Sequence, residues 1–247
     1  MIDRDGSHQH LVFADTSGYK DFFPKYAPDG GRLVFSRCQP GDSGSCAIFS
    51  VRTNGTHLHG LTPFTQGSQL RADFGATVSP DGRRIAFGRF PIGADQAQVY
   101  VIRADGSGAD AVTPLALGAF APDWTPDGRR LLVTSNCCQP NGAIYQLNPD
   151  GSDLHRLTDP PDPHNDGFPS AAPQGNRIAL TSDRAYPDLC CADLFVMRGD
   201  GSGLHKVPTG DLNEVIDPDW GRATPDDAPP AEHAVTDEPP TSPTEAG

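Results

Sequence analysis

The sequence predicts an all-β fold, a β-propeller of four-stranded antiparallel blades, and three observations carry this prediction. Two turn motifs, Pro-Asp-Gly and Asp-Gly-Ser, alternate along the chain in constant step. Short β-prone runs follow the first motif and precede the second. Gly (27) and Pro (25) make up 52 of the 247 residues, whereas average usage is about 12%. This excess is typical of many short strands joined by tight turns.

The two motifs define a repeat of about 48 residues. The glycines of the first motif, with Pro-Gln-Gly as a variant, are spaced by 52, 46 and 47 residues. Those of the second motif, with Asn-Gly-Thr as a variant, are spaced by 49, 51, 45 and 50 residues. The glycines are Gly30, Gly82, Gly128 and Gly175 in the first set and Gly6, Gly55, Gly106, Gly151 and Gly201 in the second. Two markers that keep step in this way indicate tandem copies of one structural unit.

Each unit is predicted to be an antiparallel meander of four strands. The first strand precedes Pro-Asp-Gly and carries one equivalent position, occupied by Tyr26, Val78, Trp124 or Ala171. The second strands are expected at 32–35, 84–87, 130–133 and 177–180, and the third at 47–49, 99–102, 144–147 and 194–197. The fourth strand follows Asp-Gly-Ser and ends near Leu-Thr. A sheet with two apolar faces cannot cover itself, but sheets stacked radially do.

The two ends of the chain are predicted to share a further, split unit. Residues 1–2 are the stump of its third strand, 5–7 its turn and 10–13 its fourth strand, while 217–220 repeat the first-strand pattern. We therefore expect four complete blades and one incomplete blade. Pairing of the ends would close a five-bladed ring and remove exposed edges. The alternative is a partial ring, a fragment whose true start lies upstream of Met1.

Residues 1–220 are expected to form the propeller and residues 221–247 a disordered tail. From Arg222 onward there are six acidic residues, one basic residue, six prolines and no aromatic residue, too little apolar surface to offset the entropy of ordering. The net charge is −13, of which −8 remains in the body, so nucleic acid is not an expected partner. No stretch approaches the ~18 apolar residues of a membrane helix, so membrane insertion is not expected.

All six cysteines fall in the predicted loops between second and third strands: Cys38, Cys46, Cys137, Cys138, Cys190 and Cys191. The first two bracket one loop and predict a disulfide across it, while the other two pairs lie in equivalent loops of adjacent units and can bridge them. Disulfides are the preferred interpretation, with free thiols as an alternative. Metal ligation is disfavoured because no Cys-x-x-Cys spacing occurs. Disulfides predict an extracytoplasmic location, although residues 1–7 show no signal-peptide pattern.

Three aspartates occupy one repeat position before the innermost strands: Asp21, Asp73 and Asp166. There they can ring the mouth of the central channel and bind a cation or a cationic ligand. The alternative is that each accepts backbone N–H bonds and fixes a turn. Residues 162–167 faintly resemble the start of a calcium loop, but Pro173 stands at the twelfth place, where an acidic residue is required. No cofactor is therefore expected, with Ca²⁺ as the remaining alternative.

With Pro-x-Trp-Thr-Pro-Asp-Gly at 122–128 and Asp-Gly-Ser-x-Leu-His-Arg-Leu-Thr at 150–158, the chain resembles the TolB-like β-propeller repeat over about residues 1–220. That family includes the periplasmic protein of the Tol–Pal system and the propellers of prolyl-oligopeptidase-like peptidases. The resemblance implies binding of proteins or small ligands on a propeller face outside the cytoplasm. The chain departs from the family in having five units rather than six, and neither an additional N-terminal domain nor a hydrolase domain is expected.

Binding residues concentrate on long loops, here 37–47, 89–98, 135–143 and 182–193 on the end opposite the turns. The sequence thus predicts a non-catalytic binding or scaffold propeller that docks a protein or peptide on this long-loop face, periplasmic or secreted. A monomer is expected, or an edge-to-edge dimer if the ring stays open. The alternatives are a propeller enzyme, lyase or hydrolase, with a polar or metal site at the channel mouth, and a truncated piece of a larger TolB-like propeller.

Overall fold

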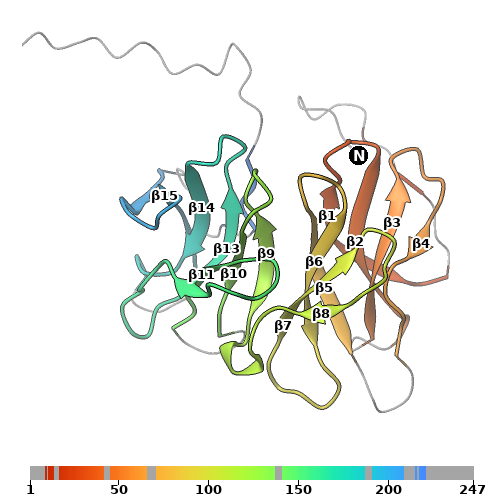
Figure 1. Ribbon diagram of the computed structural model, residues 1–247, viewed down its shortest axis with the longest axis horizontal. Coiled ribbons are helices and arrows are strands. Elements are labelled where there is room, and N and C mark those ends of the chain that lie inside the picture. The colour runs from red at the N-terminus through yellow and green to blue at the C-terminus, as the bar shows by residue number, and fades with distance from the viewer. Residues whose placement is uncertain are drawn as a thin grey trace, which may run out of the picture.

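The computed structural model describes residues 9, 11–13, 17–41, 45–65, 71–136, 141–186, 191–208, 215 and 217–220, which form four successive blades (Figure 1). Blade 1 contains β1 (Lys20–Tyr26), β2 (Arg32–Cys38), β3 (Cys46–Arg52) and β4 (His59–Gly60). Blade 2 contains β5 (Ala72–Val78), β6 (Arg84–Phe90), β7 (Gln98–Arg103) and β8 (Asp110–Ala111), followed by the 3-10 helix η1 (Leu115–Leu117). Blade 3 contains β9 (Phe120–Trp124), β10 (Leu131–Thr134), β11 (Ile144–Leu147) and β12 (His155–Arg156). Blade 4 contains β13 (Asp166–Ala171), β14 (Arg177–Ser182), β15 (Asp193–Arg198) and β16 (His205–Lys206).

Each blade is an antiparallel meander, so the predicted fold class and the order of its strands are confirmed. Neighbouring blades are joined where a third strand begins. Blades 1 and 2 share one parallel pair, Cys46 with Ala72. Between blades 3 and 4, the amide of Asp166 donates to the carbonyl of Gly142 at 2.8 Å. These links place the first strand of each following blade beside the preceding blade, at the centre of the molecule.

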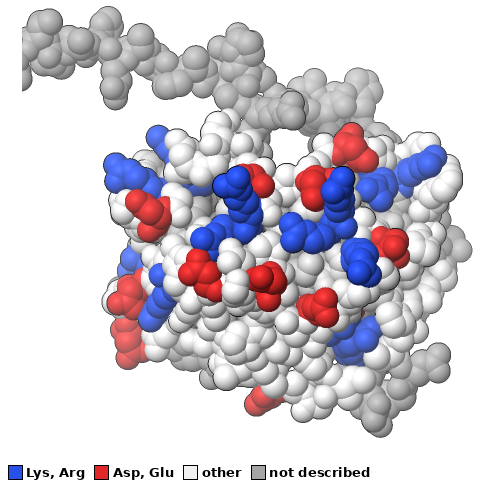
Figure 2. All heavy atoms as spheres, viewed as in Figure 1, with Lys and Arg blue, Asp and Glu red and all other residues white. Residues whose placement is uncertain are grey.

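The blades have two chemically different ends. The turn face carries the Pro-Asp-Gly and Asp-Gly-Ser turns, where an aspartate side chain accepts from the backbone, as Asp81 Oδ1 does from the amide of Arg83 at 3.1 Å. The loop face, at the bottom of Figure 1, carries the loops between second and third strands and the connections between blades. In Figure 2 the charged side chains gather toward the turn face, and the surface nearer the loop face is mostly uncharged.

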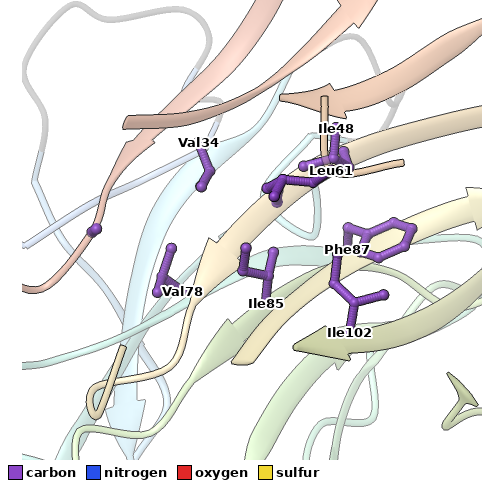
Figure 3. Packing of buried hydrophobic residues seen from close by; sticks show 9 residues of the cluster. Val34, Ile48, Leu61, Val78, Ile85, Phe87 and Ile102 are labelled. Atoms are coloured by element: carbon purple, nitrogen blue, oxygen red, sulfur yellow. The ribbon is translucent and has the colours of Figure 1, made fainter. Parts of the chain in front are cut away.

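The core lies between the blades rather than within them. The cluster between blades 1 and 2 contains Val34 and Ile48 from one sheet and Ile85, Phe87 and Ile102 from the other, and their side chains point toward one another (Figure 3). Equivalent clusters fill the spaces between blades 2 and 3 and between blades 3 and 4. Because blades 2 and 3 each have a neighbour on both sides, the apolar faces on both sides of their sheets are buried.

The N-terminal part of the split blade is recognised by a contact that repeats around the molecule. The Gly106 turn lies against the end of blade 1 so closely that a Cβ on this glycine would be 2.5 Å from the carbonyl oxygen of Leu61. The Gly201 turn meets the carbonyl of Leu157 in the same way, at 2.7 Å. The Gly55 turn of blade 1 makes this contact with the carbonyl of Val12. Residues 11–13 therefore occupy the place of a preceding blade's fourth strand.

The C-terminal part begins an inner segment between blade 4 and blade 1. The amide of Val215 donates to the carbonyl of Ala192 at 2.9 Å, the counterpart of the link that joins blades 3 and 4. The Trp220 indole N–H donates to the carbonyl of Ser170 on β13 at 2.9 Å. Lys25 on β1 lies 3.8 Å from a carboxylate oxygen of Asp217. This segment thus connects the first and fourth blades.

The predicted third-strand stump at residues 1–2 and the predicted tail at 221–247 lie outside the described residues. In the part of the chain that is described, no helix has the length and apolar character needed to cross a membrane.

Candidate functional site

The inner strands enclose a central cavity of about 310 Å³. Its lining comes from every blade and from the C-terminal segment: Phe22, Phe23, Lys25, Ser36, Cys38, Cys46, Ala72, Phe74, Gly75, Ala76, Thr77, Phe90, Phe120, Ala121, Pro122, Asp123, Phe168, Pro169, Ser170, Asp217 and Pro218. The four first strands are thus the walls of one channel, as expected of a propeller, and the segment at 217–218 completes them.

A bulge at the same place in every inner strand turns side chains into this channel. One residue there has a left-handed backbone, with φ near +50° to +60°: Phe23, Gly75, Ala121, Phe168 and Asp217. The pairing with the second strand shifts register across the same positions in the four strands. A bulge leaves a residue unpaired and increases the local twist, which re-aims the neighbouring side chains. Asp217 shares this conformation, so the C-terminal segment repeats the local geometry of an inner strand.

The channel wall has an aromatic level and a polar level. Phe22, Phe74 and Phe120 occupy one repeat position and lie toward the loop face, where Phe74 and Phe90 stack with ring centroids 5.5 Å apart. Three residues further along each strand, toward the turn face, the equivalent positions are polar: Lys25, Thr77, Asp123, Ser170 and Asp219. The site therefore combines an apolar entrance with a polar, partly charged floor.

Asp123 is the half-buried carboxylate of this floor. It accepts from the Ala171 amide at 2.8 Å and from the Thr77 hydroxyl at 3.3 Å. Burial raises the pKa of Asp123 to about 6, and the hydrogen bond from Ala171 and the charge of Lys25 oppose this rise. Lys25 lies 3.8 Å from both Asp217 and Asp219, so the floor carries one ammonium group and three carboxylates.

The three aspartates predicted from the repeat lie at the loop-face ends of the inner strands, and an arginine holds each of them. Arg37 donates to both oxygens of Asp21 at 2.8 and 2.9 Å, and Arg89 to both oxygens of Asp73 at 2.6 and 2.9 Å. Arg184 Nη2 lies 2.7 and 2.5 Å from the oxygens of Asp166. The Asp73 and Asp166 carboxylates are fully buried, whereas the Asp21 carboxylate is one-third exposed.

Arginine side chains therefore hold these carboxylates, and the alternative that each one accepts backbone N–H bonds and fixes a turn stays a prediction. Binding of a cation by Asp21, Asp73 and Asp166 stays a prediction. An arginine of the same blade already neutralises the charge of each carboxylate. In blade 3 the equivalent positions of the aspartate and the arginine are occupied by Ala119 and Ser135, so both partners are missing together. This joint absence supports a structural role for the pairs.

Aromatic rings surround the paired guanidinium groups. The Arg37 guanidinium lies 5.1 to 5.6 Å from the centroids of four rings, and the Arg89 guanidinium lies 4.5 Å from that of Tyr100. Such contacts stabilise a desolvated cation. Sequence reasoning missed these arginines, yet a signal was present, since aspartate and arginine occur together in blades 1 and 2 and vanish together in blade 3.

The predicted disulfide between Cys38 and Cys46 is present, and both residues line the cavity. Cys137, Cys138 and Cys190 lie outside the described residues, so the predicted bridge between their loops stays a prediction. Within residues 162–167, the Asp166 carboxylate is held by Arg184, and the described ranges contain no group of three His, Cys, Asp or Glu side chains able to hold a metal ion.

A second hollow of about 450 Å³ lies between blades 3 and 4 on the loop face, beside Asn136, Asn165 and Asp183. Asp183 accepts from the backbone and the side-chain amide of Asn165 at 2.6 and 3.0 Å. This network fixes the connection that leads into β13.

These features define a β-propeller whose candidate functional site is the central channel, and known proteins share this architecture. No family model matches the chain. It is 34% identical over 111 residues to the uncharacterized peptidase YuxL of Bacillus subtilis, and 33% identical over 103 residues to the Tol-Pal system protein TolB of Anaeromyxobacter dehalogenans. These matches cover 45% and 41% of this chain but only 16% and 21% of the relatives, so the chain matches about a sixth to a fifth of their length.

Solved structures agree in fold. TolB from Acinetobacter baumannii superposes over 86% of this chain and 49% of its own, with a TM-score of 0.65 and 17% identity. An oligogalacturonate lyase in complex with manganese superposes over 83% of this chain and 58% of its own, with a TM-score of 0.56 and 16% identity. The chain has the TolB-like β-propeller fold.

Proposed function

We propose that this chain is a non-catalytic binding propeller that docks a protein or peptide segment at the loop-face mouth of its central channel. The observation that carries the proposal is the cavity of about 310 Å³, whose mouth is ringed by phenylalanines from all four blades. Concave, mostly apolar sites with a few convergent polar groups are the usual binding sites of proteins. The likeness to TolB, a protein of the Tol-Pal system, supports a scaffold role.

The surroundings of the mouth favour a macromolecular partner. Phe22 and Phe23 are each 43% exposed, and Ile92 and Leu115 on the loop face are 49% and 40% exposed. Large apolar side chains left in water on one face mark interaction sites. The scarcity of charges near this face in Figure 2 agrees with such a role.

An extracytoplasmic location is part of the proposal. The Cys38–Cys46 disulfide supports it, because disulfides persist mainly in oxidising compartments. The periplasmic members of the resembled family agree with it.

The test is selection of peptides from a random display library on the immobilised full chain, followed by affinity measurements on variants. We expect selected peptides to lose at least about tenfold in affinity on Phe22→Ala/Phe23→Ala, because truncating two aromatic anchors removes over 1.4 kcal/mol. Leu58→Ala is the matched control, since Leu58 is 41% exposed and outside the cavity. Peptides equally sensitive to both changes, or no selected peptide at all, would contradict the proposal.

The second candidate is a propeller with enzymatic activity, and the observation that favours it is the 111-residue match to an uncharacterized peptidase. Arginines hold the three inner aspartates, which favours the scaffold. Chromogenic peptide and glycoside substrates decide between the candidates. Binding without turnover supports the scaffold, and turnover by the purified chain supports the enzyme.

A further inference from the structure

The cavity wall is well suited to cations at its aromatic level. Phe74 and Phe90 have ring centroids 5.5 Å apart, and Phe120 and Phe168 lie 5.7 Å apart in an edge-to-face arrangement. All four rings line the cavity. An aromatic face attracts a cation within about 6 Å of its centroid, more strongly when the cation is desolvated.

The floor below the rings carries an excess of negative charge. Asp123 and Asp217 line the cavity, Asp219 lies beside them, and Lys25 is the cation among them. The Lys25 ammonium is 3.8 Å from its two acidic partners. This distance exceeds that of a charge-assisted hydrogen bond, about 2.7–2.9 Å, so these ion pairs leave the carboxylates able to accept from a second donor.

We propose that the cavity binds a cationic head on an apolar stem, specifically the side chain of a lysine or arginine carried by a docked peptide. The inference deepens the proposed function and rests on it. The stem passes the phenylalanine rings and the head donates to Asp123 and Asp217. Lysine and arginine have this shape, an apolar stem that tolerates burial and a charged tip. An anionic head would meet three carboxylates and a single lysine.

The test separates stem from head with three probes that share a six-carbon stem: hexylammonium, hexanol and heptanoate. Binding to the full chain is measured by titration calorimetry at pH 8, where Asp123 is ionised because its pKa is about 6. The variants are Asp123→Asn, which removes a floor charge without changing its shape, and Lys25→Met, which removes the competing cation. Asp105→Asn on the turn face is the control, since it makes the same chemical change outside the cavity.

We expect hexylammonium to bind, hexanol to bind at least about tenfold more weakly and heptanoate not to bind, because hydrogen bonds between charged groups are stronger than those of a neutral hydroxyl. Asp123→Asn should weaken hexylammonium binding at least tenfold, Lys25→Met should strengthen it, and Asp105→Asn should leave it unchanged. A damaged fold cannot produce opposite effects at two neighbouring residues. Equal binding of hexanol and hexylammonium, or indifference to both floor variants, would overturn the inference.

Failure of this inference is distinguishable from failure of the proposed function. If selected peptides depend on Phe22 and Phe23 but keep their affinity when their lysines and arginines are replaced by methionine, the docking function stands and the cation site is ruled out. If hexylammonium binds as expected and no peptide is selected, the cation site stands and peptide docking is ruled out.

Discussion

Arg89 holds the buried carboxylate of Asp73 with two hydrogen bonds, from Nε to Oδ1 at 2.6 Å and from Nη2 to Oδ2 at 2.9 Å. The pair fastens the inner strand β5 to β6 at the loop face. Its counterparts, Asp21 with Arg37 and Asp166 with Arg184, do the same in blades 1 and 4. In blades 1, 2 and 4 an ion pair thus ties the inner strand to its own blade at the loop face.

Removal of one partner of the Asp73–Arg89 pair is predicted to lower the free energy of unfolding more than removal of both partners. Arg89→Met leaves the Asp73 charge buried and should lower the free energy of unfolding by about 3 kcal/mol; Arg71, 3.5 Å from Asp73, compensates in part. The double variant Asp73→Ala/Arg89→Met should recover most of this loss, because blade 3 folds with Ala119 at the same place. Urea denaturation measures both values. A double variant less stable than the single one would contradict the argument.

The Gly106 turn of blade 2 lies so close to blade 1 that a larger residue at this position is predicted to clash with it. A Cβ there would lie 2.5 Å from the Leu61 carbonyl oxygen, at φ +89°. Gly93 has φ +74° with nothing within 4 Å of such a Cβ. Gly93→Ala should therefore lower the free energy of unfolding only by the strain of a left-handed backbone, about 1–2 kcal/mol. Gly106→Ala should lower it by at least about 1 kcal/mol more, because the added Cβ also meets the Leu61 carbonyl. Equal shifts of the thermal midpoint would mean that blade packing does not constrain the turn.

Stability is predicted to depend on pH through Asp123. Its pKa is raised from 3.8 to about 6 in the folded chain, so its contribution to stability is full below pH 4 and is lost as pH rises through 6. The loss is at most about 3 kcal/mol, from roughly two pKa units. Asp123→Asn keeps the acceptor for the Ala171 amide and should abolish this decline, making the variant the more stable chain at pH 7 to 8.

The comparison for this prediction is Asp105→Asn. Hydrogen bonds from Ser107 lower the pKa of Asp105, so its contribution is present above the unfolded pKa and lost as pH falls. Denaturation curves between pH 4 and 8 should show the same decline in this variant as in the parent chain. A decline that persists in Asp123→Asn would point to another group.

The joint between the C-terminal segment and blade 4 is predicted to depend on Trp220. Its indole N–H donates to the carbonyl of Ser170 at 2.9 Å, so Trp220→Phe should cost about 1 kcal/mol for the lost hydrogen bond. Trp220→Ala should cost more, because packing is lost too. Tyr26→Phe is the control, since Tyr26 is 55% exposed. Unchanged denaturation midpoints in both Trp220 variants would exclude the segment as part of the wall.

The disulfide is predicted to be detectable by mass and by melting. Reduction of Cys38–Cys46 alone adds about 2 Da, and three disulfides, as the sequence predicts, would add about 6 Da. The loop between Cys38 and Cys46 is short, with a sequence separation of 8, so its closure stabilises the fold by only about 2.5 kcal/mol. Reductant should lower the melting temperature accordingly, and the serine variants should abolish that response.

The repeat, the order of its four strands, the split blade and the Cys38–Cys46 pair follow from the sequence alone. Each rests on chemistry within a single unit: a turn that needs Gly at positive φ, an apolar run beside it, two cysteines bracketing one loop. Such signals lie within about 25 residues of one another and recur, so the repeat averages out their local variation.

Only the tertiary structure decided the channel. The contacts that build it join residues of different blades, as in the hydrogen bond from Ala171 to Asp123, 48 positions apart, and that from Trp220 to Ser170, 50 apart. In the sequence, Phe120 and Asp123 have the pattern of a core residue and a turn residue. Only the arrangement of five inner segments around one axis places them in the channel wall. The pKa of Asp123 and the excess charge of the floor arise from that convergence, because burial and distance, and not residue type, set the strength of an electrostatic interaction.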